Sequence, residues 1–420
     1  MIQRLKDGCK RGTLVALATV LVLDQVLVRQ FLPKEEERFR AVPPFLEPLR
    51  GDQVDWIERN LHASGDRSPE LFQFEADLGW SNAPNWQSPA GDQSTNSRGY
   101  RGRREYEPEI PEGMVRVTCT GDSFTWGAEV ADAEAYPAIL EVLAPTVEAP
   151  NLGVSAYGTD QAFLRYKQEQ PRLASDYVVV GIMAENIGRN VNRLRPLWAP
   201  YSSMVAVKPR FTVNDGALTL VPVPFASAAD LRAAIADGSL VARCAPDEHW
   251  SKQPLLGHLR FSPSARLVGA SYARYQRKVP ALWTNPSGDA FQTTRAILHA
   301  FLDEARSGRV KRVLVIFFPN RWALRLAREQ EQMPWDDLVH ELETAGALVL
   351  DAAQVLLREQ ERSRADRVFT KGGHLLPQYN LAIATAVAER LELPSGTSWI
   401  ESTPPAAGGP AAPEQDKETR

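Results

Sequence analysis

The stretch Met114–Gly127, MVRVTCTGDSFTWG, decides how the rest of the chain is interpreted. Apolar and polar residues alternate from Val115 to Thr120, which is the pattern of a β-strand. Gly121 ends that strand, and Asp122 and Ser123 open a new element, as in a strand–turn–helix unit that exposes a serine at the edge of a sheet. Ser123 is therefore the candidate nucleophile. The alternative is that Asp122 or Ser123 only caps the following helix, because both residue types are good caps.

Strand-like and helix-like segments alternate from this stretch onward. The run Tyr177–Met183, YVVVGIM, is uniformly apolar, which is typical of a parallel strand buried on both faces. The other expected strands cover residues 115–119, 146–151, 310–318 and 347–350. The expected helices cover residues 134–143, 159–169, 293–307, 334–345 and 378–391. This alternation predicts an α/β fold over residues 112–394, a three-layer α/β/α sandwich with a mainly parallel sheet.

A segment at about residues 193–286 interrupts the alternation. Within it, residues 208–221 predict a β-hairpin, because Asn-Asp-Gly at 214–216 separates two β-rich runs. A short helix is expected at 228–236. We interpret the segment as a β-containing insertion after the third strand, where a loop borders the carboxyl edge of the sheet and could serve as a lid or a substrate platform. An oligomer contact is the alternative.

Two further blocks bear on Ser123: Asn151–Gly158, NLGVSAYG, and Gly372–Pro377, GGHLLP. Together with the Gly-Asp-Ser at 121–123, they resemble the blocks of SGNH or GDSL-type hydrolases over roughly residues 112–394. A serine hydroxyl needs a neighbouring base and donors for the developing oxyanion.

The resemblance assigns these parts to residues. It implies that His374 is the general base for Ser123. It also implies that the backbone N–H groups of Ser123 and Gly153, with a side-chain amide after the third strand, form the oxyanion hole. Serine acyl chemistry implies neither a metal nor an organic cofactor.

The sequence departs from the family pattern at two places. Glu185 stands in the register of the expected amide, and Asn186 follows one place late, so Asn186 is the candidate third donor. Lys371 stands where the family has an aspartate, three residues before the histidine. Asp366 is then the tentative acid, ahead of Asp351, and a Ser-His dyad oriented by a backbone carbonyl is the alternative.

Composition narrows the class of protein. The chain has 420 residues, 44% of them hydrophobic, and a formal net charge of −4 with both signs interspersed. A nucleic-acid-binding surface is therefore not expected. Three cysteines without paired spacing predict neither a disulfide framework nor a zinc site.

The N-terminal residues predict a membrane anchor. Residues 1–11 are basic, and residues 12–32 are largely apolar without a small-residue cleavage site, so we expect an uncleaved signal anchor that places the rest of the chain on the periplasmic side of the inner membrane. Asp24 and Gln25 allow an amphipathic soluble helix instead. Residues 33–111 are expected to form an N-terminal extension that packs on the rim of the domain, and residues 395–420 a disordered tail.

Two functions follow from these features. The first is a serine esterase or O-acyltransferase that acts on an acylated envelope glycan or another ester substrate. The second is a catalytically degenerate SGNH-fold protein that binds a glycan or a partner during envelope assembly. The same fold would serve both, so an assay of ester hydrolysis, and its loss in Ser123→Ala, has to separate them.

Overall fold

The computed structural model describes residues 14–26, 51–60, 70–199, 202–251, 278–329 and 331–394. The basic segment 1–11, both ends of the expected anchor 12–32 and the expected tail 395–420 lie outside the described residues. So do residues 252–277 of the expected insertion.

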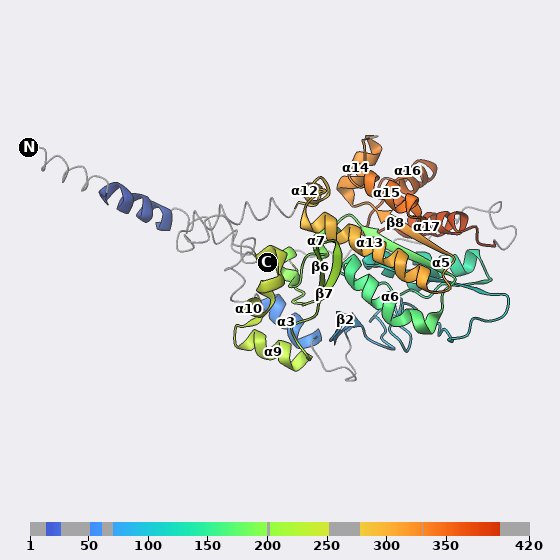
Figure 1. The fold of residues 1–420 in the computed structure, drawn as a ribbon, viewed down its shortest axis with the longest axis horizontal. Helices are drawn as coiled ribbons and strands as arrows, with labels where there is room; N and C mark the ends of the chain where they lie inside the picture. Colours follow the sequence, from blue (N-terminus) through green and yellow to red (C-terminus); the bar gives the residue numbers. More distant parts are fainter. Residues whose placement is uncertain are drawn as a thin grey trace, which may run out of the picture.

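A five-stranded parallel sheet forms the centre of the body (Figure 1). In spatial order its strands are β4 (Val147–Glu148), β3 (Val115–Thr120), β5 (Tyr177–Met183), β8 (Arg312–Phe318) and β9 (Leu348–Asp351). Every neighbouring pair is parallel, and β5 and β8 are buried along almost their whole length. That burial explains their continuous apolar sequences. The predicted α/β fold with a mainly parallel sheet is confirmed.

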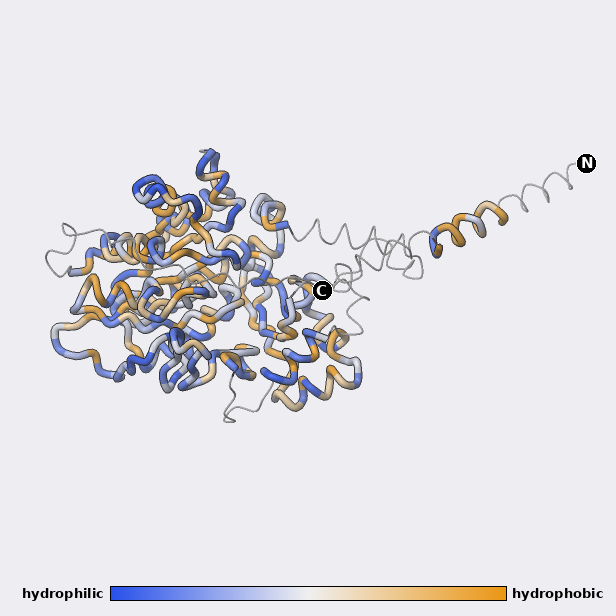
Figure 2. Tube along the Cα trace, turned by 180° about the vertical axis from the view of Figure 1, so that it is seen from behind, coloured by the Kyte–Doolittle hydropathy of each residue, from blue (hydrophilic) through white to orange (hydrophobic). Residues whose placement is uncertain are grey.

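Helices cover both faces of this sheet. α6 (Thr159–Leu173) packs against α13 (Asp289–Ser307), while α5 (Tyr136–Leu143) packs against α17 (Pro377–Arg390) on the other side (Figure 1). α15 (Asp336–Thr344) lies beside β9. The sequence did not predict the helices α14 (Arg321–Arg328) and α16 (Ala352–Ser363), among others. Figure 2 shows apolar residues concentrated inside this body.

The expected insertion contains a hairpin and short helices. The hairpin consists of β6 (Arg210–Asn214) and β7 (Ala217–Val221), as predicted. Its described residues include the helices α8 (Arg195–Trp198), α9 (Ala228–Ala236), α10 (Leu240–Cys244) and α12 (Val279–Trp283). Arg210 of β6 pairs with Asp289 at the start of α13 at 3.1 Å, which ties the hairpin to the body.

The N-terminal extension contains α3 (Gly51–Asn60) and a hairpin of β1 (Phe72–Glu75) and β2 (Gly79–Asn82). Residues 14–26 form a helix that lies apart from the body and is largely apolar (Figure 2). Its apolar side chains are exposed, with Leu14 and Val15 each 66% exposed. In the part of the chain that the structure describes, no helix has the length and apolar character needed to cross a membrane.

Candidate active site

The carboxyl ends of three adjacent strands meet at one edge of the sheet, and polar residues follow each of them. Ser123 follows β3 and is the first residue of α4 (Ser123–Trp126). The Asp122 side chain caps this short helix by accepting a hydrogen bond from Phe124 N at 2.9 Å. Burial raises the pKa of Asp122, although Arg189 opposes the shift. The capping interpretation therefore holds for Asp122, and it leaves the Ser123 hydroxyl available.

Ser123 and His374 lie within hydrogen-bonding distance although 251 positions separate them in sequence. The distance between Ser123 Oγ and His374 Nε2 is 2.9 Å. The His374 ring is packed against Phe124, with ring centroids 5.7 Å apart. Ser123 is 6% exposed and opens into a pocket. The nucleophile and base expected from the resemblance are thus in the arrangement that proton transfer requires.

The carboxylate that contacts the histidine is Glu129, which the sequence analysis did not identify. Its Oε2 atom lies 2.6 Å from His374 Nδ1. Because a carboxylate only accepts hydrogen bonds, Nδ1 carries the proton and Nε2 is free to accept from Ser123. Glu129 lies on the loop after α4 with φ +65°, a left-handed conformation that aims its side chain across at the histidine loop.

The histidine loop is built to receive Glu129. Thr370 Oγ1 donates to Glu129 Oε2 at 2.6 Å, and Gly372 N donates to Oε1 at 3.2 Å. A Cβ at Gly372 would lie 2.3 Å from Oε2, so only glycine lets the carboxylate approach. Thr370 also accepts from His374 N at 3.1 Å, which joins base, acid and loop in one network.

Neither of the aspartates considered from the sequence orients His374. Asp366 is exposed, and the described contacts of His374 do not include it, so the expectation that it is the acid is wrong. Asp351 caps α16 by accepting from Ala353 N at 2.9 Å, a structural role. Lys371 lines the pocket beside Ser123 and His374.

The ionisation of Glu129 predicts a pH dependence of stability. Burial raises its pKa, but hydrogen bonds from Thr370 and His374 outweigh burial, and its pKa lies below the usual value. A lowered folded-state pKa stabilises the fold above the unfolded-state pKa, and that contribution is lost as the pH falls through the folded-state value. We expect the Tm difference between the wild type and Glu129→Gln to persist from pH 7 to about pH 5 and to shrink below about pH 4. A difference unchanged at pH 3 would contradict the assignment.

The predicted oxyanion donors are only partly available. Among the described residues, the Ser123 N–H has no acceptor and remains free. The Gly153 N–H donates to Asn151 Oδ1 at 2.9 Å, so it is already used. Ala156 lines the pocket with φ +70°, and no acceptor within the described chain engages its N–H. The N–H of Ala156 is therefore available to a ligand in the pocket, whereas that of Gly153 is not.

Asn186 does not reach the hole. Its Nδ2 donates to Asp122 Oδ2 at 3.1 Å and to Tyr157 O at 2.9 Å, and its Oδ1 accepts from Met183 N. These bonds use both amide hydrogens at a residue that is 1% exposed, so the expectation that Asn186 supplies the third donor is wrong. Glu185 occupies the pocket wall instead and pairs with Arg189 at 3.3 Å.

Gly153 is needed for packing, and this gives a test. A Cβ at this position would lie 2.3 Å from Trp126 N and 2.8 Å from Thr125 C, directly behind α4. We expect Gly153→Ala to lower the free energy of unfolding by about 1–3 kcal/mol and to lower kcat, because the clash displaces the helix that carries Ser123. Ala156→Gly is the control: it relieves a positive φ and should keep the fold and the activity. Stability equal to wild type for Gly153→Ala in chemical denaturation would contradict the packing role.

The N-terminal extension supports the loop that carries Ala156. Trp80 Nε1 donates to Ser155 O at 3.2 Å, and Asn82 Nδ2 donates to Gly153 O at 3.1 Å. The Tyr157 hydroxyl donates in turn to Trp80 O at 2.7 Å. The extension therefore acts as a structural belt that fixes the backbone of residues 151–158.

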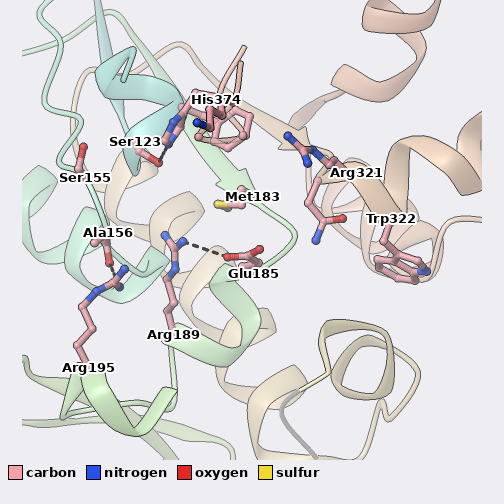
Figure 3. A pocket seen from close by; sticks show the side chains of 15 residues that line it. Ser123, Ser155, Ala156, Met183, Glu185, Arg189, Arg195, Arg321, Trp322 and His374 are labelled. Atoms are coloured by element: carbon pink, nitrogen blue, oxygen red, sulfur yellow. Dashed lines mark hydrogen bonds and ion pairs between the residues drawn. The ribbon is translucent and has the colours of Figure 1, made fainter. Parts of the chain in front are cut away.

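Ser123 and His374 border a pocket of about 520 Å³ (Figure 3). Ser123 and His374 lie at one end, Ala156, Arg189 and Arg195 along one side, and Arg321 and Trp322 on the opposite wall. The lining comes from β5, from α8 of the insertion, from α14 and from the histidine loop. The insertion thus contributes Arg195 to the pocket lining.

No family model matches this chain, and no curated protein matches it. Similar solved structures include a member of the lipolytic protein G-D-S-L family from Veillonella parvula, at 10% identity and a TM-score of 0.31, covering 66% of this chain and 97% of that one. A catalytic mutant of an acetylxylan esterase from Geobacillus stearothermophilus matches at 11% identity and a TM-score of 0.37, covering 70% of this chain and 100% of that one. An alpha/beta hydrolase enzyme from the metagenome of Lake Arreo matches at 13% identity and a TM-score of 0.34, covering 68% and 99%. The solved structures that this chain is similar to thus include G-D-S-L proteins and esterases.

Proposed function

We propose that this protein is a serine-dependent esterase or O-acyltransferase. The observation that carries the proposal is the continuous line from Glu129 Oε2 through the His374 ring to Ser123 Oγ, with contacts of 2.6 and 2.9 Å. A non-catalytic fold does not require a carboxylate to fix the tautomer of a histidine whose other nitrogen faces a serine hydroxyl. These three groups are what acyl transfer through serine needs.

The reaction proceeds in two half-steps. Ser123 Oγ attacks the ester carbonyl carbon as its proton moves to His374 Nε2, and the oxyanion forms near the N–H groups of Ser123 and Ala156. The bond to the alcohol oxygen then breaks, and the alcohol leaves with the proton from Nε2. A water or a sugar hydroxyl next attacks the acyl-enzyme, gives its proton to His374, and releases the acid or the new ester as Ser123 recovers its proton.

Hydrolysis and transfer differ only in the acceptor, so the proposal covers both. An acylated glycan or a small ester is the proposed substrate class, because the pocket has room for a sugar-sized group beside Ser123. Two backbone donors replace the usual set of three. Loss of one donor typically costs about 10²–10³ in rate, so a slow enzyme is expected.

The proposed location is the periplasmic side of the inner membrane, with an N-terminal anchor. This part rests on the sequence, in which basic residues precede the apolar segment 12–32. Fractionation of cells that express the full-length chain tests it. Recovery in the membrane fraction after a high-salt wash supports the anchor, and recovery in the soluble fraction rejects it.

Hydrolysis of para-nitrophenyl acetate by the full-length protein is the first test of the activity. Turnover above the spontaneous rate, abolished in His374→Ala, supports the esterase. No turnover with several acyl donors, together with retained glycan binding, would favour the degenerate binding protein instead.

A further inference from the structure

The pocket beside Ser123 contains more positive than negative charge. Its described lining includes the cationic side chains of Arg189, Arg195, Arg321 and Lys371, against one carboxylate, Glu185. A neutral ester, such as an acetylated neutral sugar, carries no negative charge that would balance this surplus of positive charge. The electrostatic potential of such a cleft favours an anionic ligand.

Arg189 is already balanced by carboxylates of the chain. Its Nη2 lies 3.3 Å from Glu185 Oε2, and its Nη1 lies 3.4 Å from Asp122 Oδ2. The charge surplus therefore belongs to the other three cations.

Among the described residues, no carboxylate forms an ion pair with Arg195. Its hydrogen bonds go to neutral oxygens, Ser202 Oγ at 3.3 Å and Ala156 O at 3.5 Å. Burial and the like charge of Arg189 lower the pKa of Arg195 to about 9. A guanidinium that is partly desolvated in this way gains strongly from a bound carboxylate, which it can hold through two parallel hydrogen bonds.

The opposite wall adds positive potential. Arg321 starts α14, and its Nη2 donates to the neutral carbonyl of Thr370 at 3.2 Å. The N-terminal end of this helix borders the pocket, and its dipole adds to the positive charge. Lys371, which stands where the family has an aspartate, is exposed at the same pocket. Because Glu129 is the carboxylate that contacts His374, position 371 holds a cation instead of an acid.

We propose that the substrate of this site is an ester that also carries a carboxylate, which binds Arg195 while the ester carbonyl lies at Ser123. An O-acylated sugar acid is one carrier of this chemistry, and an ester of a dicarboxylic acid is the other. This inference rests on the proposed function, because it names the substrate class of the same pocket.

The test compares matched pairs of esters on the full-length protein. With the charge on the alcohol side, the pair is para-acetoxybenzoate and its methyl ester. With the charge on the acyl side, the pair is para-nitrophenyl para-carboxybenzoate and its methyl ester. The wild type should prefer the anionic member of one pair, and that pair identifies the side that carries the charge. Arg195→Gln should lower the anionic-to-neutral ratio of kcat/KM at least about tenfold, mainly through KM, because a hydrogen bond to a charged group contributes about 1.5–3 kcal/mol.

Two further variants make the result specific. Arg321→Gln removes an exposed cation from the same pocket. It should lower the ratio without disturbing the packing of the protein. Arg325→Gln removes the same charge from the exposed face of α14 outside the pocket and should leave the ratio unchanged. A wild type that prefers the neutral member of both pairs, or a ratio that Arg195→Gln leaves unchanged, overturns the proposal.

Failure of the proposed function gives a separate signal. If no ester is hydrolysed, calorimetric titration of Ser123→Ala with glucuronate and with glucose decides the question. Binding of glucuronate alone, lost in the double variant that also carries Arg195→Gln, supports the anion site in a non-catalytic protein. Absence of glucuronate binding overturns it.

Discussion

Replacing Ser123 with alanine is expected to lower kcat for ester hydrolysis by a factor on the order of 10⁴–10⁶. The reason is that the acyl-enzyme cannot form, and only binding and the backbone donors remain. The fold should be retained, since the Asp122 cap accepts from Phe124 N and does not involve the serine hydroxyl. Initial rates with para-nitrophenyl acetate and thermal denaturation measure both effects.

The control for this variant is Ser155→Ala. Ser155 also lines the pocket, but no role in catalysis is assigned to its hydroxyl. Activity of Ser123→Ala within about tenfold of the wild type would show that another group performs the chemistry.

Glu129→Gln is expected to lower kcat by about 10²-fold with little change in KM. Glutamine can still accept a hydrogen bond, but it does not stabilise the imidazolium that forms when His374 takes the serine proton, and it can favour the wrong tautomer. The effect should be smaller than for a fully buried acid, because the Glu129 side chain is 38% exposed. Water can therefore supply part of the stabilisation of the imidazolium that the carboxylate provides. Steady-state kinetics across pH 5 to 9 separates this loss from a change in binding.

Asp366→Asn is the matched control, because it removes a carboxylate from the segment that precedes His374, and that carboxylate does not contact His374. It should leave kcat unchanged. A larger loss for Asp366→Asn than for Glu129→Gln would reinstate the acid expected from the sequence.

The fold was predictable because each strand and helix carries its own pattern. The runs at 177–183 and 310–318 are apolar throughout, and this identifies buried parallel strands without any knowledge of their neighbours. Ser123 and His374 were identified through the resemblance of their sequence blocks, and their approach was predictable, since one follows the first strand of the sheet and the other precedes the last helix. Elements at those positions in a doubly wound sheet end at the same edge.

Glu129 was not predictable, because its role depends on contacts that span 245 positions. Nothing in the sequence around it marks the left-handed backbone that turns its side chain toward the histidine loop. The one available signal was Gly372, whose missing Cβ leaves space for a carboxylate. That glycine indicates a close approach without identifying the partner.

The oxyanion donors show a second limit. Glycine is the usual signal for a left-handed position, and here Ala156 adopts that conformation while Gly153 serves packing. Asn186 is a suitable donor by residue type, but burial against Asp122 and Tyr157 commits its amide. Residue type therefore identified the loops that border the pocket, but the donor atoms that it indicated, Gly153 N and Asn186 Nδ2, are engaged in other hydrogen bonds.

The central claim is that Glu129 and His374 activate Ser123 as a nucleophile. Reaction of the full-length protein with a fluorophosphonate, followed by intact-mass and peptide mass spectrometry, tests it without knowledge of the natural substrate. The account predicts a single adduct on Ser123, absent in Ser123→Ala and formed at least about tenfold more slowly in Glu129→Gln. A folded wild-type protein that remains unlabelled, or an adduct at another residue alone, would contradict it.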